Sequence, residues 1–178
     1  MKISHVIRAE EHLNNGFKQL MLIEALGFKA PQYGHIPLVL APDKTKLSKR
    51  HGAVGVTQYK RDGFLSKALV NYLAKLGWGE KASDRELYTM EELVKAFSLE
   101  GCHASGAVFD VVKLNWFNSH YIKELSEAQI VEKVKEHLGV DLSSLLGSEG
   151  SKKLLLALRE RATNLKDFSL ALTWLAAG

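Results

Sequence analysis

The first forty residues show a hydrophobic pattern that predicts two strands with a helix between them. A β-rich run at 3–7 predicts the first strand, and after a polar stretch apolar positions recur at helical spacing. We expect Asn14 or Asn15 to cap that helix and Gly27 to close it. A second apolar run at 36–40 predicts a second, buried strand. Strand, helix and strand in this order form a parallel α/β unit, which is too small to be a complete doubly wound sheet.

From Arg61 onward the pattern is helical. A stripe of apolar residues between 68 and 76 is ended by Gly77, and two further helical runs cover 151–161 and about 164–177. The sequence therefore predicts a mostly α protein with a small α/β portion. Three other helix starts carry side-chain caps, which are Thr89 with Glu92, Asp110, and Ser126 with Gln129.

Composition places the chain among ordinary globular proteins. It has 178 residues, of which 46% are hydrophobic and 25% charged. Cys102 is the only cysteine, which excludes an internal disulfide and a cysteine zinc cluster. No apolar run approaches the roughly 20 residues that a membrane helix needs, and the first residues lack the apolar core of a signal peptide. These features predict a protein that is neither secreted nor embedded in a membrane.

Positive charge is concentrated in the first third of the chain. The net charge is +4 and the pI is near 9.1, while residues 1–60 alone carry a net charge of +5. Between 43 and 61, the only acidic residue is Asp43, among six lysines and arginines. A compact basic patch suits a phosphate-bearing partner, either a nucleotide or a nucleic acid. Charge alone favours the simpler interpretation, a solvated surface loop.

The segment 41–55 carries the first candidate site. It follows the second predicted strand, where open α/β sheets place ligand loops, and Lys46 and Lys49 flank the hydroxyl of Ser48. Ammonium groups on a mobile loop can close over a polyphosphate and neutralise charge that develops at the reacting phosphorus. By itself, a K-x-S-K string is more typical of a basic turn.

The segment 5–12 carries the second candidate site. Arg8 lies just past the end of the first predicted strand, where a guanidinium can hold a carboxylate through two hydrogen bonds. Glu11 and His12 can hydrogen-bond a ribose or stack on a base. An ion pair of Arg8 with Glu10 or Glu11 is an equally good interpretation of this segment.

Ordered motifs through both segments resemble one family. The stretch from residue 3 to about 78 resembles the second half of the catalytic region of glutamyl-tRNA synthetases, a class I family, and a thinner likeness continues to about 125. Beyond 125 the likeness is only a general helical one. The motifs are S-H-V-I-R-A-E-E-H-L at 4–13, Q-L at 19–20, E-A-L-G at 24–27, Pro31, H-I-P-L at 35–38, K-L-S-K-R-H-G-A at 46–53, D-G-F-L at 62–65, N-Y-L at 71–73 and L-G-W at 76–78.

The resemblance implies roles for individual residues. Residues 46–50 stand where class I synthetases have their second signature loop, with Lys49 facing the ATP phosphates. Arg8 matches an arginine that reads a carboxylate of glutamate, and Val39 matches a residue whose backbone reads adenine. The implied site residues are Lys46, Ser48, Lys49 and Arg50 for catalysis, Arg8 for glutamate, Glu11, His12, Val39 and Lys49 for ATP, and Lys60, Arg61 and Lys113 for tRNA.

The resemblance also implies organisation and partners. Residues 1–55 would be the C-terminal part of a Rossmann-type catalytic domain, 56–125 a helical stem-contact domain, and 126–178 the start of an α-helical anticodon-binding domain. The implied substrates are L-glutamate, tRNA(Glu) and ATP with Mg²⁺, with no metal held by the protein itself. We expect a monomer in a bacterial-type cytoplasm or an organelle matrix.

Two features depart from the family. The first signature motif, of His-x-Gly-His type, is absent, and residues 14–17 differ from the usual Asn-Thr-Pro pattern. The chain is therefore expected to be an internal fragment of a ligase, inactive alone.

A second function stays open, since the chain could also be a non-catalytic tRNA-binding module. An enzyme that glutamylates a modified tRNA base lacks a region like 126–178, and a glutamine-specific synthetase has a β-barrel there, so both are weaker alternatives.

The other reactive or aromatic residues are expected to be structural. Cys102 and His103 offer too few ligands for a metal site. Tyr33 and Tyr59 can stack on a nucleobase, but packing is the simpler expectation. Three tryptophans are expected in the core, namely Trp78, Trp116 and Trp174.

Overall fold

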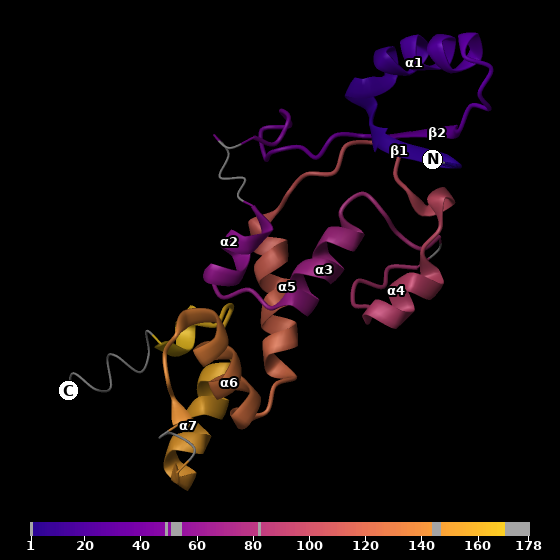
Figure 1. The fold of residues 1–178 in the computed structure, drawn as a ribbon. Coiled ribbons are helices and arrows are strands. Elements are labelled where there is room, and N and C mark those ends of the chain that lie inside the picture. The colour runs from indigo at the N-terminus through magenta and orange to yellow at the C-terminus, as the bar shows by residue number, and fades with distance from the viewer. Residues whose placement is uncertain (1, 49, 51–54, 82, 144–146, 170–178) are drawn as a thin grey trace.

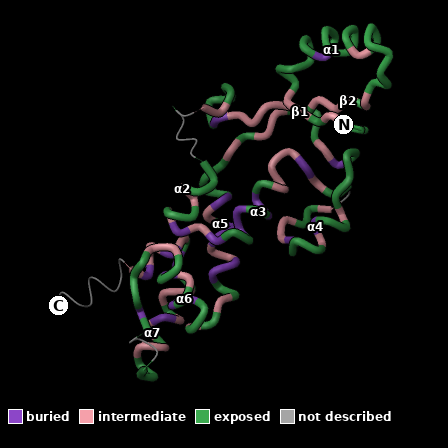
Figure 2. The backbone as a smooth tube through the Cα atoms, viewed as in Figure 1, coloured by how far each residue is buried: buried purple, intermediate pink, exposed green. Residues whose placement is uncertain are grey.

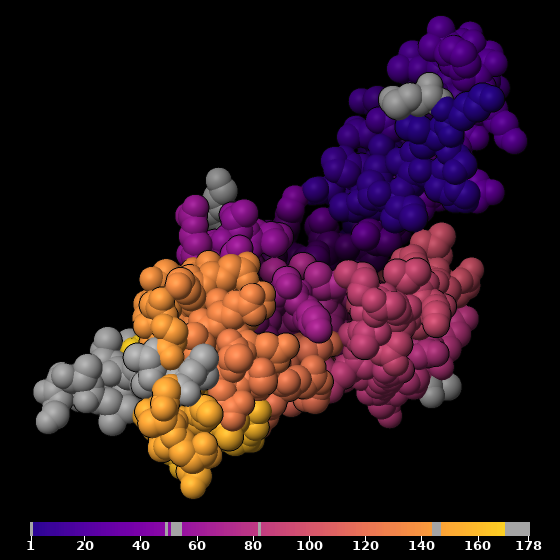
Figure 3. Space-filling model, turned by 60° about the horizontal axis from the view of Figure 1, so that its bottom comes forward, coloured from indigo at the N-terminus to yellow at the C-terminus, as the bar shows by residue number. Residues whose placement is uncertain are grey.

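The computed structural model describes residues 2–48, 50, 55–81, 83–143 and 147–169 (Figure 1). Most of the regular structure is helical, and a two-stranded parallel sheet lies near the N-terminus. This confirms the predicted fold class. The molecule is elongated, and the N-terminal α/β unit forms a lobe that projects from the helical remainder (Figure 3).

The α/β unit has the predicted order of elements. Strand β1 (His5–Ala9) leads through a 3₁₀ turn (Glu10–His12) into α1 (Leu13–Ala25), and β2 (Gln32–Ile36) pairs with β1 in parallel. Gly27 closes α1 at a φ of +70°, as predicted.

The predicted cap of α1 is wrong. No side chain of the described residues caps this helix, which starts at Leu13 and not after Asn14 or Asn15. The 3₁₀ turn runs directly into the helix, so both asparagines lie inside its first turn.

The second strand lies earlier than the predicted 36–40. It ends at Ile36, because Pro37 has no N–H to donate to a ladder. The residues after Pro37 pair elsewhere: the Leu40 N–H donates to the Ala107 carbonyl, and the Phe109 N–H donates to the Leu40 carbonyl, both at 2.8 Å. The apolar run therefore joins the α/β unit to the segment that precedes α5.

The remaining elements form a helical body. Their bounds are α2 (Val56–Arg61), α3 (Ser66–Lys75), α4 (Met90–Ala96), a 3₁₀ turn (Leu99–Gly101), α5 (Val111–Lys123), α6 (Glu127–Leu138) and α7 (Glu149–Arg159). Both capping boxes and the Asp110 cap are formed as predicted. The six-residue α2 was not predicted, because it is too short to show a period. Of the predicted helix at about 164–177, residues 166–169 are helical and 170–178 lie outside the described residues.

One hydrophobic core lies between α3, α5, α6, α7 and the residues that follow α7. Its fully buried members include Leu114, Phe117 and Phe168. Asn118 is buried within it and joins three segments, because it accepts a hydrogen bond from the Leu65 N–H at 2.8 Å and donates to the Thr163 carbonyl at 2.7 Å.

The tryptophans differ from one another. Trp78 is buried beside Tyr88 and Leu93 in a smaller cluster, as predicted. The prediction for Trp116 is wrong: it is 47% exposed, because its neighbour Phe117 occupies the inward face of α5. Trp174 lies outside the described residues.

The α/β unit has no comparable core among its described residues. Among described residues 2–40 only Gly16 is buried, and Figure 2 shows α1 exposed along nearly its whole length. Phe17, Met21 and Leu26 are each more than half exposed. No helix in the described part of the chain is both long and apolar enough to span a bilayer.

Candidate functional site

The two candidate segments meet at the carboxyl edge of the two-stranded sheet. Because β1 and β2 are parallel, the 3₁₀ turn after β1 and the chain after β2 leave the sheet on the same side. The Lys46 Nζ lies 2.6 Å from the Glu11 Oε2, which makes an ion pair between residues 35 positions apart. The hydrogen bond from Lys46 holds the pKa of Glu11 below its usual value. The pair brings one residue of each predicted site together.

The described part of the cationic loop is a short turn on the surface. The Ala41 N–H donates to the Thr45 carbonyl at 2.8 Å, and the Leu47 N–H donates to the Val39 carbonyl at 2.9 Å. Asp43 accepts hydrogen bonds from the backbone and hydroxyl of Thr45. Lys46 and Arg50 are exposed, and Ser48 is half-buried. The predicted phosphate-facing Lys49 lies outside the described residues.

Arg8 is held by uncharged groups. Its Nη1 donates to the Gln19 Oε1 at 2.7 Å, and its Nε donates to the His35 Nε2 at 3.3 Å. The Tyr33 ring centroid lies 5.0 Å from the Cζ of Arg8, within cation–π distance. The Nη2 atom is buried and has no hydrogen-bond partner in the described part of the chain. A buried guanidinium nitrogen without an acceptor is a suitable donor for an anionic ligand.

The alternative ion pair of Arg8 with a neighbouring glutamate is not formed, although all three residues are described. Glu10 accepts a hydrogen bond from the Leu38 N–H at 3.4 Å, and Glu11 binds Lys46. His12 is exposed next to Glu11, with 3.9 Å between its Nε2 and the Glu11 Oε1. Both nearby carboxylates are therefore turned away from the guanidinium.

Gln19 and His35 are contacts that reasoning from the sequence missed. Both lie within motifs that resemble the family, but no role was assigned to them. The parallel register sets His35 opposite Arg8, and the predicted second strand at 36–40 did not include His35. The rotation of α1 about its axis, which turns Gln19 toward Arg8, cannot be read from the spacing of apolar residues in the sequence.

The three predicted tRNA contacts lie in the helical body. Lys60 pairs with Glu136 at 3.2 Å, and Lys113 pairs with Glu86 at 2.9 Å, whereas Arg61 is exposed at the end of α2. Lys60 lines a cavity of about 530 Å³ between α2, α3, α5 and α6. Two of the three cations are therefore already paired in this structure.

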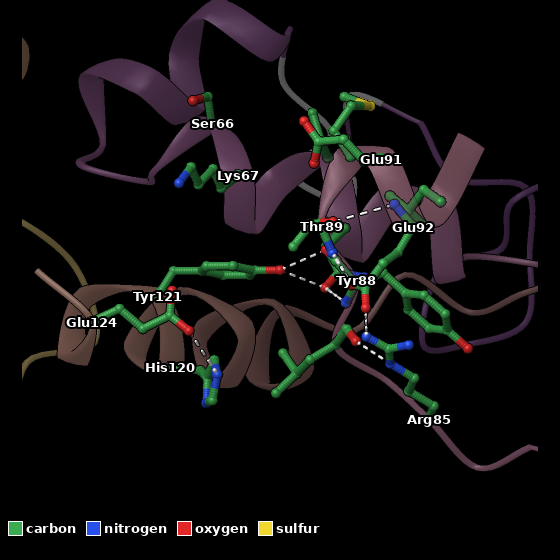
Figure 4. A pocket seen from close by; sticks show the side chains of 15 residues that line it. Ser66, Lys67, Arg85, Tyr88, Thr89, Glu91, Glu92, His120, Tyr121 and Glu124 are labelled. Atoms are coloured by element: carbon green, nitrogen blue, oxygen red, sulfur yellow. Dashed lines mark hydrogen bonds and ion pairs between the residues drawn. The ribbon is translucent and has the colours of Figure 1, made fainter. Parts of the chain in front are cut away.

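A large cavity among the described residues lies away from the Arg8 site. It measures about 710 Å³ and opens between α3, α4 and α5 (Figure 4). Four of its lining residues contact one another in pairs: Arg85 binds Glu92, and the His120 Nε2 lies 3.5 Å from the Glu124 Oε1. None of the predicted site residues lines it.

The surroundings of Cys102 and the possible metal ligands can be described together. Cys102 is half-buried, and its backbone forms an isolated antiparallel β-bridge with the backbone of Trp78. No three His, Cys, Asp or Glu side chains gather as metal ligands among the residues that the structure describes.

A parallel α/β unit with an arginine at the end of one strand and a lysine-containing loop after the other is an arrangement expected of a class I synthetase. The profile described as "tRNA synthetases class I (E and Q), catalytic domain" matches residues 1–116, and the chain belongs to this family. The resemblance seen in the sequence is thereby confirmed.

Several curated relatives that match the chain are glutamate–tRNA ligases. The enzyme of Desulforudis audaxviator is 52% identical over 135 residues, which are 76% of this chain and 27% of the relative. That of Nitratidesulfovibrio vulgaris is 43% identical over 174 residues, which are 95% of this chain and 36% of the relative.

Solved structures give the same result for the fold. A glutamate tRNA ligase from Elizabethkingia meningosepticum, crystallised in complex with its amino acid, matches with a TM-score of 0.77 and 33% identity. The match covers 94% of this chain and 36% of that one. The chain thus spans about a third of the length of such relatives.

Proposed function

We propose that the chain supplies the second half of the active site of a glutamate–tRNA ligase. The ligase joins glutamate to ATP as glutamyl-adenylate with release of pyrophosphate, and then transfers glutamate to the 2′-hydroxyl of the terminal adenosine of tRNA(Glu). The observation that carries this proposal is the buried Arg8 Nη2, which has no hydrogen-bond partner among the described residues, at the sheet edge where Glu11 binds Lys46 of the cationic loop. A ligase that is 52% identical over 135 residues supports it. In this role the protein positions its substrates and neutralises charge, with little covalent chemistry of its own.

Each part of the site has a proposed task. Arg8 binds a carboxylate of glutamate. Lys46, Lys49 and Arg50 neutralise the triphosphate, which arrives with Mg²⁺ as substrate, and the Ser48 hydroxyl donates a hydrogen bond to it. Removal of one such donor costs about 3–4 kcal/mol of barrier in comparable sites. Glu11, His12 and the Val39 backbone contact the nucleotide, and Glu11 also steadies Lys46.

The helical body is proposed to hold tRNA. Residues 56–125 would contact the stem, and residues from 126 would begin the anticodon-binding region. Lys60, Arg61 and Lys113 are the proposed phosphate contacts. Lys60 and Lys113 would exchange Glu136 and Glu86 for phosphates, a small cost because exposed ion pairs contribute little.

The exposed apolar side chains of the α/β unit fit the same proposal. Phe17, Met21, Leu22 and Leu26 on and beside α1 are 63–71% exposed. Contiguous exposed apolar surface marks an interaction site. We propose that another part of the ligase's catalytic domain covers it, since the relatives are almost three times as long as the matched chain.

The test is a chimeric ligase, in which the matched segment of the Nitratidesulfovibrio vulgaris enzyme is replaced by this chain. We expect glutamate-dependent exchange of pyrophosphate into ATP in the presence of tRNA(Glu). Lys49→Ala should lower the rate of exchange about 100- to 1000-fold with little change in glutamate binding. Arg8→Ala should instead raise the KM for glutamate about 10- to 100-fold.

Two results would contradict the proposal. A chimeric ligase that folds but does not catalyse pyrophosphate exchange would contradict the proposal that this chain forms part of an active ligase. Retention of tRNA on filters by the 178-residue chain, together with that inactivity, would favour the non-catalytic tRNA-binding module. Unchanged glutamate binding by Arg8→Ala in titration calorimetry would contradict the role of Arg8.

A further inference from the structure

We infer that Gln19 and His35 are positioning residues, which hold the Arg8 guanidinium through uncharged contacts so that its charge stays available to the substrate carboxylate. This inference rests on the proposed function of Arg8. It concerns residues that do not themselves touch glutamate. In this inference, glutamate binding depends on Arg8 and also on the absence of negative charge among the groups that contact Arg8.

Three uncharged groups fix the orientation of the guanidinium. Gln19 on α1 accepts from Nη1 at 2.7 Å, and His35 on β2 accepts from Nε at 3.3 Å. The Tyr33 ring supports the Cζ from one side at 5.0 Å. Because the guanidinium is planar and both Nη1 and Nε are hydrogen-bonded, the N–H groups of Nη2 point in a fixed direction.

The absence of a carboxylate from this set of contacts has a chemical consequence. An Asp or Glu at position 19 would form a charge-assisted pair with Arg8 and would compete directly with the substrate. An amide or an imidazole accepts one hydrogen bond and leaves the positive charge uncompensated. The nearby Glu10 and Glu11 do not compete, because they bind the Leu38 N–H and Lys46.

The hydrogen bond to His35 also determines the form of its ring. The Nε2 atom accepts from Arg8, so it carries a lone pair and the ring proton is on Nδ1. The His35 ring lies parallel to the Tyr33 ring, at an interplanar angle of 8° with 6.3 Å between the ring centroids. Two stacked rings therefore support the guanidinium from β2.

Gly16 leaves the space that Nη2 needs. A Cβ at this position would lie 3.1 Å from the Arg8 Nη2, closer than ordinary van der Waals contact. Gly16 is also the only buried residue of α1 among those described. A glycine inside a helix is unfavourable for the helix itself, so its presence at the point nearest to Nη2 supports a requirement for room there.

The decisive variant is Gln19→Glu in the chimeric ligase, measured by pyrophosphate exchange. A carboxylate placed on Nη1 should raise the KM for glutamate at least about tenfold while kcat and the KM for ATP stay within about twofold. Asn14→Glu is the matched control, since it adds the same charge to an exposed position on another face of α1. It should leave the KM for glutamate unchanged.

A second pair of variants tests His35. His35→Phe keeps a ring next to Tyr33 but removes the acceptor, and should raise the KM for glutamate about fivefold to tenfold. His35→Gln restores an acceptor and should recover most of that loss, which a purely structural role would not do.

An equal rise in the two KM values, no effect of Gln19→Glu, or no recovery in His35→Gln would overturn the inference. Each of these outcomes is distinct from failure of the proposed function, in which the unsubstituted chimera would itself be inactive.

Discussion

Helices α1 and α5 have the same length of 13 residues but opposite surroundings. On α5 five residues are buried, including Phe117 with no exposed surface, whereas on α1 only Gly16 is buried and Phe17 is 63% exposed. Both helices carry large apolar side chains. The difference shows that α5 belongs to the hydrophobic core, and it supports the proposal that the exposed side of α1 is one side of an interface.

The comparison also separates the two proposed tasks of the molecule. The helical body obtains its stability from side chains packed between helices. The α/β unit is joined to this body through Leu40 and residues 107–109, and its site chemistry lies at its exposed edge. We therefore expect substitutions in the core of the body to change folding, and substitutions at the exposed edge of the unit to change function.

The largest expected effect contrasts two phenylalanines. Phe117→Ala should lower the free energy of unfolding by about 3–5 kcal/mol, because it opens a cavity in the core. Phe17→Ala should change it by less than about 0.5 kcal/mol. Urea unfolding followed by circular dichroism measures both in the 178-residue chain. Similar losses for the two variants would contradict the proposed difference between the regions.

The next effect concerns two asparagines. Asn118→Ala leaves the Leu65 N–H and the Thr163 carbonyl without their partner in the core, and should cost about 2–3 kcal/mol. Asn14→Ala on the exposed face of α1 should be neutral or slightly stabilising, because alanine is the better helix former. Thermal unfolding of both variants decides this, and a neutral Asn118→Ala would show that the site relaxes or admits water.

A smaller effect is expected at the start of α5. Asp110 accepts hydrogen bonds from the N–H groups of Val112 at 2.8 Å and Lys113 at 3.2 Å. Asp110→Ala should therefore cost about 1 kcal/mol. His12→Ala, at the uncapped start of α1, is the control and should cost little, so equal shifts of the urea midpoint would argue against the cap.

The smallest effect depends on pH. Hydrogen bonds from Lys133 and Lys60 lower the pKa of Glu136 to about 2. A carboxyl with a lowered folded-state pKa stabilises the fold above its usual pKa near 4.5, and this contribution is lost as the pH falls toward 2. Because Glu136 is 43% exposed, the contribution should stay below about 1 kcal/mol.

The Glu136→Gln variant should accordingly have a lower urea midpoint of unfolding than the unsubstituted chain at pH 6. At pH 2 the two midpoints should be the same. The matched variant Glu11→Gln breaks the ion pair with Lys46 in the α/β unit. It should leave the unfolding of the helical body unchanged at both pH values. A pH-independent difference for Glu136→Gln would show that the network does not act through ionisation.

Local signals were the most reliable part of the sequence. The boxes at Thr89 and Ser126, the Asp110 cap and the glycines at 27 and 77 depend on hydrogen bonds and φ angles within a few residues. The second strand was placed wrongly because an apolar run was given more weight than Pro37, which cannot donate to a ladder. The burial of Trp116 was also mispredicted, since neighbouring positions on a helix can differ fully in exposure.

The sequence by itself determined where most helices start and stop, which family the chain resembles, and that Arg8 and the residues from 46 to 50 carry candidate chemistry. These features depend on short-range geometry and on ordered motifs. Only the tertiary structure decided that Glu11 meets Lys46, that Gln19 and His35 hold Arg8 without charge, and that α1 lies uncovered. The reason is physical: strand register and the rotation of a helix are set by contacts between segments far apart in the chain, which no local pattern encodes.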